Sequence, residues 1–232
     1  MTERHELRWG GFAGFAFVVL AVVASLLPGL PPRVTAAADE ITAYVSDGQG
    51  RMMLSALLWA VSAALVIWFT AAFAEALRER AERSDVHIAL MAGGVLVGGA
   101  IFFLGVAQAV TANGLEGRAD EITTGLFQAT MVLNAMIGLA AAVPLTAAGI
   151  GIMRTRMLPD WLGYVALAAA AISVLGSLSI FATSGSLVPG GPVMSYVSLV
   201  VGGIFVLCAS GYMVREHLPE AGQVAVAPAG TR

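Results

Sequence analysis

The sequence predicts an all-α fold: a polytopic membrane helix bundle of six transmembrane helices with both termini in the cytoplasm. Three observations predict it. The 232 residues are 58% apolar and only 12% charged, whereas about 25% of the residues in a soluble domain are charged. Six stretches are long and apolar enough to cross a bilayer, and none contains Asp, Glu or Arg. The arginines are shared unequally between the loops on the two sides.

The predicted spans are separated by turn-forming or polar connections. Leu27–Pro32 ends the first span, Arg154–Asp160 separates the fourth from the fifth, and Ser184–Pro192 separates the fifth from the sixth. We expect residues 1–215 to form the membrane domain and the Pro/Ala/Gly-containing residues 216–232 to be a disordered cytoplasmic tail. The six spans are Gly10–Pro28, Met52–Phe73, His87–Ala112, Thr123–Met153, Trp161–Thr183 and Val193–Val214.

The arginine distribution predicts the orientation. Nine arginines lie in the N-terminal segment, the second and fourth loops and the C-terminal tail, and three lie on the other side, Arg33, Arg51 and Arg118. Basic residues concentrate in cytoplasmic loops, so both termini are predicted to be cytoplasmic, and the protein is predicted to lie in the cell (cytoplasmic) membrane. Two termini on one side require an even number of spans, in agreement with six.

The first span has a second interpretation, a cleaved signal peptide, because Ala36–Ala38 resembles a small-residue cleavage site. Glu3 and Glu6 in the preceding segment argue against it. Cleavage would leave five spans and place the new N-terminus outside.

Two pairs of similar short segments suggest a duplicated hairpin. Ala38–Thr42 recurs as Ala119–Thr123, and Trp9–Phe12 resembles Trp161–Tyr164. The similar segments fit three hairpins of like orientation. Chance in a sequence of biased composition explains them equally well.

The composition excludes several kinds of chemistry and predicts neither a cofactor nor a metal. The chain has no lysine, which excludes a Schiff base, retinal attachment and a P-loop lysine. Cys208 is the single cysteine, so neither an intrachain disulfide nor a multi-cysteine metal site can form, and we expect it to be buried in the sixth span. The histidines, His5, His87 and His217, all fall on the predicted cytoplasmic side, and the net charge of −3 offers no basic surface for nucleic acid.

Acidic residues gather in the predicted outer loops. Asp39, Glu40, Asp120 and Glu121, with Asp47 and Glu116 nearby, are candidates for catalytic acids or for oxygen ligands of a hard cation. The alternative is that they are solvated helix starts, because acids in a first turn interact favourably with the helix dipole.

Uncharged polar residues inside the spans are candidate pocket-lining residues. Because polar groups in hydrocarbon must find partners, we expect these side chains to face the bundle, with the Gln108 and Gln128 amides at similar depth. They either line a pocket or form hydrogen bonds between helices. The set is Gln108, Thr124, Gln128, Thr130 and Asn134.

Trp59 and Trp68 are nine residues apart on opposite helix faces, so at least one should face protein.

Small residues at i, i+4 spacing predict close helix packing, mainly within the chain. Pro144 should kink the fourth span. The charged stretch Ala74–Arg83 should continue the second span as a helix, on which Glu75 and Arg78 are spaced to form an ion pair. The small-residue pairs are Gly10 and Gly14, Gly94 and Gly98, Ser198 and Gly202, and the row Ala169, Ser173 and Ser177.

The segment Met153–Tyr164, with its basic residues followed by Leu-Pro-Asp-Trp-Leu, resembles a pattern in uncharacterised bacterial six-helix integral membrane proteins that contain a domain of unknown function. Asp47–Arg51, leading into the second span, is similar to the same group. The resemblance implies a helical bundle in a bacterial cytoplasmic membrane and carries no catalytic residues.

Three functions are compatible with these observations. The first is a non-enzymatic membrane component, transporter-like, lipid-binding or accessory, whose partners are the lipid bilayer and a small hydrophobic ligand. The second is a membrane-embedded enzyme for a lipid-like or terpenoid substrate, with the outer carboxylates as acids. The third is a structural subunit that packs as a homo-oligomer or against a membrane partner.

Overall fold

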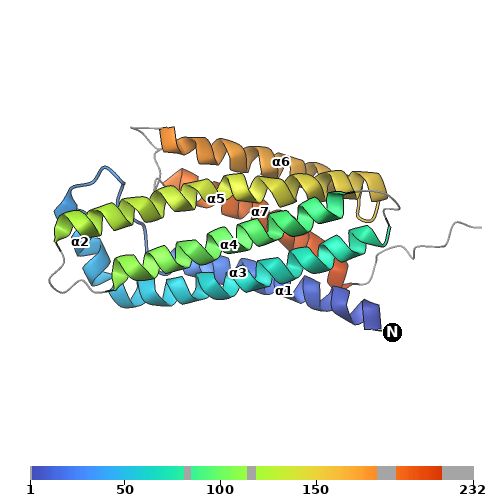
Figure 1. Ribbon diagram of the computed structural model, residues 1–232, viewed down its shortest axis with the longest axis horizontal. Coiled ribbons are helices and arrows are strands. Elements are labelled where there is room, and N and C mark those ends of the chain that lie inside the picture. Colours follow the sequence, from blue (N-terminus) through green and yellow to red (C-terminus); the bar gives the residue numbers. More distant parts are fainter. Residues whose placement is uncertain (1, 81–84, 114–118, 182–191, 216–232) are drawn as a thin grey trace, which may run out of the picture.

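The computed structural model describes residues 2–80, 85–113, 119–181 and 192–215. This part of the chain contains seven α-helices, one short 3-10 helix and no strand (Figure 1). The predicted all-helical class is therefore confirmed. The predictions for Arg83, Glu116, His217 and the tail 216–232 lie outside the described residues, as do the side chains of His5 and Ser198.

Five helices of the described part are long and apolar enough to cross a membrane: Leu7–Leu26, Gln49–Arg78, Val86–Ala112, Asp120–Thr155 and Asp160–Phe181. Leu199–Val214 is a shorter apolar helix. These stretches belong to α1 (Thr2–Leu26), α3 (Gln49–Arg78), α4 (Val86–Ala112), α5 (Asp120–Thr155), α6 (Asp160–Ser177) with η1 (Leu178–Phe181), and α7 (Pro192–Val214).

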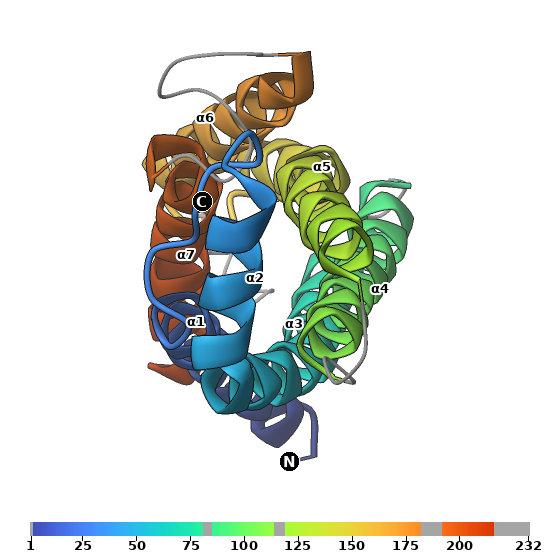
Figure 2. The ribbon, with the colours of Figure 1, turned by 90° about the vertical axis from the view of Figure 1, so that its left-hand side faces the viewer.

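The long helices pack as a closed ring in the order α1, α3, α4, α5, α6 and α7, and α7 packs back against α1. Figure 2 shows this ring end-on. Each helix runs antiparallel to the one before it, so α1 begins and α7 ends at the same end of the ring (Figure 1). Large apolar side chains such as Trp68, Phe103 and Leu175 are exposed on the outside, where a bilayer would cover them.

The seams between neighbouring helices are narrow because small residues line them. A Cβ atom added at Gly94 would collide with Thr70 across the α3–α4 seam, and one at Gly14 would collide with Ser210 across the α1–α7 seam. On α5, Gly138 lies against the backbone of Ser173. These glycines make intrachain contacts, as expected. Gly202 differs, because no atom lies within 4 Å of a Cβ added there.

A short helix, α2 (Ala38–Asp47), lies across one end of the ring (Figure 2). A helix start at Asp39 and Glu40 was one of the two interpretations of the acidic residues, but a separate short helix was not predicted. Ile41 and Val45, four residues apart, are fully buried on its inner face, and the Tyr44 ring meets the Phe127 ring of α5 with centroids 5.9 Å apart. This amphipathic helix therefore covers the end of the ring through its apolar face.

Two sequence expectations need correction. The helix expected to reach Arg83 ends at Arg78, where a turn begins, although the expected ion pair between Glu75 and Arg78 is present on its exposed face. Cys208, expected to be buried, is half-buried on α7. Pro144 lies inside α5, which continues as a helix on both sides of it, and Gly93 of α4 provides the space for its ring.

Candidate functional site

The ring surrounds a partly open cavity of about 230 Å³. Residues of all six ring helices and of α2 line it, so the cavity lies along the axis of the ring. Its lining on α3 extends from Met52 to Phe73, which at 1.5 Å per residue corresponds to about 32 Å. The cavity is thus long and narrow.

The cavity wall near the chain termini is apolar. Phe73 and Leu90 are almost fully buried there, as is the Phe205 ring, which meets Phe73 edge-on with centroids 6.3 Å apart. The Thr70 hydroxyl donates to the Val66 carbonyl of its own helix at 2.9 Å, so its polarity is satisfied locally. The wall at this end therefore has the composition of a protein core, although part of the space between the side chains is unfilled.

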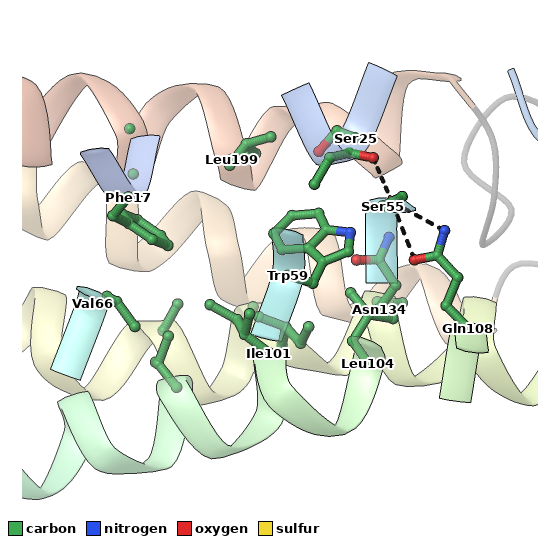
Figure 3. Close-up of a pocket in the computed structure, with 18 of the residues that line it drawn as sticks. Phe17, Ser25, Ser55, Trp59, Val66, Ile101, Leu104, Gln108, Asn134 and Leu199 are labelled. Atoms are coloured by element: carbon green, nitrogen blue, oxygen red, sulfur yellow. Dashed lines mark hydrogen bonds between the residues drawn. The ribbon is translucent and has the colours of Figure 1, made fainter. Parts of the chain in front are cut away.

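The wall near α2 carries hydrogen-bonding side chains (Figure 3). Ser55 of α3 is at the centre of the best connected group. Its hydroxyl donates to the Ala24 carbonyl of α1 at 2.7 Å and accepts from Gln108 Nε2 of α4 at 3.1 Å. The Ala24 carbonyl has no donor within α1, because the residue four positions later is Pro28, which lacks an N–H. Ser55 therefore satisfies an otherwise unpaired carbonyl and connects three helices.

A second polar contact joins α4 to α5. The Thr111 and Thr130 hydroxyl oxygens lie 3.2 Å apart, and both residues are buried and line the cavity. Each hydroxyl also reaches the carbonyl four residues earlier in its own helix at 2.8 Å. These groups are satisfied by protein atoms.

Asn134 and Trp59 differ from these satisfied groups. Both line the cavity, both are half-buried, and in the described part of the chain neither side chain makes a hydrogen bond. Figure 3 shows them beside Ser55 and Gln108 at the same level of the cavity. The cavity therefore presents an amide and an indole N–H that are available to a ligand.

The candidate pocket residues lie in two places. Gln108, Thr130 and Asn134 line the cavity. Gln128 is exposed at the end of the bundle, where its amide donates to the Val34 carbonyl at 2.8 Å, and Thr124 is half-buried with an unpartnered hydroxyl. The two glutamine amides thus bond to different partners.

Sequence reasoning missed Ser55 and the position of Trp59 in the wall. A signal was present, because Ser55, Trp59 and Ser62 follow i, i+4, i+7 spacing on one face of the second predicted span. Trp59 faces the cavity and Trp68 is exposed, so one of the two tryptophans does face protein.

The acidic candidates lie at helix starts. Asp39 and Glu40 are exposed in the first turn of α2, and Asp120 and Glu121 are exposed in the first turn of α5. None of the four lines the cavity. Over the described residues, no group of three or more His, Cys, Asp or Glu side chains could hold a metal ion.

The described lining contains no carboxylate, imidazole, guanidinium or thiol. Its chemistry is therefore apolar contact along most of its length and neutral hydrogen bonding at one end. Comparisons with protein-family models, with curated proteins and with solved structures find no match for this chain.

Proposed function

We propose that the chain is a non-enzymatic multi-pass membrane protein that binds a single-chain hydrophobic ligand inside its ring of helices. The observation that carries this proposal is the long axial cavity of about 230 Å³, which is apolar except at one end. Most ligand pockets are likewise apolar with a few polar groups that fix orientation. The candidate carboxylates lie outside the lining, so we do not propose catalysis.

The size of the cavity favours a chain-like occupant. If each water-sized group takes about 30 Å³, then 230 Å³ holds about eight such groups. This matches a medium-length acyl chain or a short isoprenoid. The elongated lining along α3 favours a chain over a compact ligand, and a chain of about eight groups occupies part of its length.

Apolar contact with the walls also favours an occupant. An apolar chain that moves from water into the cavity gains about 25 cal/mol for each Å² of apolar surface that it buries. Binding to the folded state alone would therefore also stabilise the protein.

In the proposed arrangement, six helices span a cytoplasmic membrane and both termini face the cytoplasm. α1 begins and α7 ends at the same end of the ring, which supports termini on one side of the membrane (Figure 1). Arg8, Arg78 and Arg154 lie at that end, whereas Arg33 and Arg51 lie at the end covered by α2. The arginine excess therefore favours a cytoplasmic location for the terminal end.

Filling the cavity tests the proposal. Gly202 of α7 lines the cavity and has open space where a Cβ would lie, so Gly202→Leu should project into the cavity. Gly211→Leu is the matched control, because Gly211 lies on the same helix, also has open space, and is not part of the lining.

Ligand contact can be measured with a variant in which Trp59 is the only tryptophan and with decanol brominated at the end of its chain as a quencher. The bromine should quench Trp59 saturably in the parent and in Gly211→Leu, and much more weakly in Gly202→Leu. A Trp68-only variant reports the exposed surface, where quenching should not saturate. Equal quenching in both glycine variants would contradict a cavity site.

A further inference from the structure

The cavity carries its polar groups at one end and, over the described residues, no charge along its whole lining. This distribution restricts the chemical class of the ligand's headgroup as well as requiring an apolar chain. A ligand with one polar end would place that end beside Ser55, Gln108 and Asn134. Its chain would then lie beside Ile101 and Val66, the next part of the wall (Figure 3).

The absence of charge in the described lining disfavours an ionised headgroup. Moving a carboxylate or phosphate out of water into such surroundings costs many kcal/mol unless an opposite charge pairs with it. No arginine or histidine lies in the described lining to provide that charge. A neutral polar headgroup loses only its hydrogen bonds to water, which a few neutral partners can replace.

The available partners both donate and accept. Asn134 makes no hydrogen bond to described residues, so its amide offers two N–H donors and a carbonyl acceptor. Trp59 adds one N–H donor, and Gln108 retains a second N–H after donating to Ser55. A hydroxyl group matches this set, because it donates one hydrogen bond and accepts two.

We propose that the cavity binds a neutral single-chain alcohol, whose hydroxyl bonds to the Asn134 amide beneath α2 and whose chain extends past Ile101 toward Val66. This inference rests on the proposed ligand-binding function and assigns the class of headgroup. A linear fatty alcohol and a short prenyl alcohol share this chemistry.

Three probes of equal chain length separate the headgroup from the chain: decanol, decanoate and decane. Binding to the full-length protein is measured in detergent micelles by competition with brominated decanol, at about pH 8 where decanoate is ionised. Decanol should bind at least about a hundredfold more tightly than decanoate, because the ionised group has no partner.

Asn134→Leu tests the assigned residue. This variant should weaken decanol binding about threefold to tenfold, the loss expected for one neutral hydrogen bond, and leave decane binding unchanged. Gln128→Leu is the control on the same helix, because Gln128 is exposed and lies outside the lining. It should leave the binding of all three probes unchanged.

The outcomes distinguish the two proposals. If decanol and decanoate bind equally, or if Asn134→Leu does not change decanol binding, the headgroup inference is overturned while the cavity still binds chains. If no probe binds in competition, or if Gly202→Leu weakens none of them, the proposed function fails as well. A preference for decanol over decanoate, together with weaker decanol binding in Asn134→Leu and in Gly202→Leu, supports both.

Discussion

Replacing Ser55 with alanine tests the connection between helices at the polar end of the cavity. The wild-type hydroxyl donates to the Ala24 carbonyl at 2.7 Å and accepts from the Gln108 amide at 3.1 Å. Ser55→Ala removes both hydrogen bonds. It also leaves the Ala24 carbonyl without a donor, because Pro28 has no N–H to replace it.

The expected loss of stability can be estimated from these contacts. Hydrogen bonds between membrane helices contribute about 0.6 kcal/mol on average and at most about 1.7 kcal/mol. An unsatisfied buried polar group costs about 1–3 kcal/mol. Because Ser55 is fully buried, we expect Ser55→Ala to lower the free energy of unfolding by about 2–3 kcal/mol.

The assay is reversible unfolding in mixed micelles by titration with dodecyl sulfate, followed by far-ultraviolet circular dichroism. Ser46→Ala is the control, because that exposed hydroxyl contacts only the Ala43 carbonyl of its own helix at 3.0 Å. Its effect should stay within about 0.5 kcal/mol. Gln108→Leu, alone and combined with Ser55→Ala, completes a double-mutant cycle with an expected coupling of about 0.6 kcal/mol.

Two results would refute this reasoning. If Ser55→Ala costs no more than Ser46→Ala, the Ala24 carbonyl does not depend on Ser55. If the Ser55→Ala and Gln108→Leu effects add without coupling, the 3.1 Å contact between their side chains contributes no stability.

Three further predictions concern helix packing, the attachment of α2 to the end of the ring, and membrane topology. Gly94→Ala should destabilise the protein by about 1–3 kcal/mol because its Cβ collides with an α3 side chain, whereas Gly99→Ala on the same helix enters open space and should stabilise by about 0.5–1 kcal/mol; equal effects in the same titration would contradict the narrow seam. Tyr44→Ala removes a ring contact that holds α2 and should raise amide hydrogen exchange in α2 but not in α4, measured by mass spectrometry; unchanged exchange in α2 would show that this contact does not hold it. In a cysteine-free background, a membrane-impermeant maleimide should label Ser46→Cys in intact cells and Arg154→Cys only after permeabilisation, and the reverse pattern would overturn the proposed orientation.

The long helices could be predicted because their signal is local. A run of about 20 apolar residues has few alternatives to a membrane helix, and the expected span His87–Ala112 differs from the observed Val86–Ala112 by one residue. α2 could not be predicted in this way. Its ten residues are too short to span, and its apolar face depends on Ile41 and Val45, which gain stability only against α3, α4 and α5.

The pentapeptide Ala-Asp-Glu-Ile-Thr shows how far local sequence determines structure. Both copies place Asp and Glu in the first turn of a helix, at Ala38–Thr42 and Ala119–Thr123. One helix ends after ten residues, next to Gly48, and the other continues for 36 residues through an apolar sequence. The five residues specify a helix start, and the following residues specify its length.

The candidate site could be predicted only in part. A polar side chain such as Asn134 in an apolar span must avoid lipid, so its inward position follows from its type. The residue type of Ser55 does not require an inward position, because a serine in a helix can bond to its own backbone. Its spacing with Trp59 and Ser62 indicates a shared helix face but not the partner of the hydroxyl. Its role depends on Pro28, which leaves the carbonyl of Ala24 unpaired 31 residues away from Ser55. That relation exists only once α1 and α3 are packed together.

The axial cavity follows from the ring itself. Six equal cylinders in a closed ring surround a space about as wide as one of them, roughly 10 Å for helices with side chains. Aromatic side chains such as Phe17, Phe69 and Phe205 fill part of that space, but the wall also includes Gly202 and Ala141, where larger residues would fill more. The stability of the Gly202→Leu variant therefore separates two explanations. If the cavity is only residual space, the variant gains stability and no ligand binding is lost. If the cavity binds a ligand, the variant gains stability but loses ligand binding.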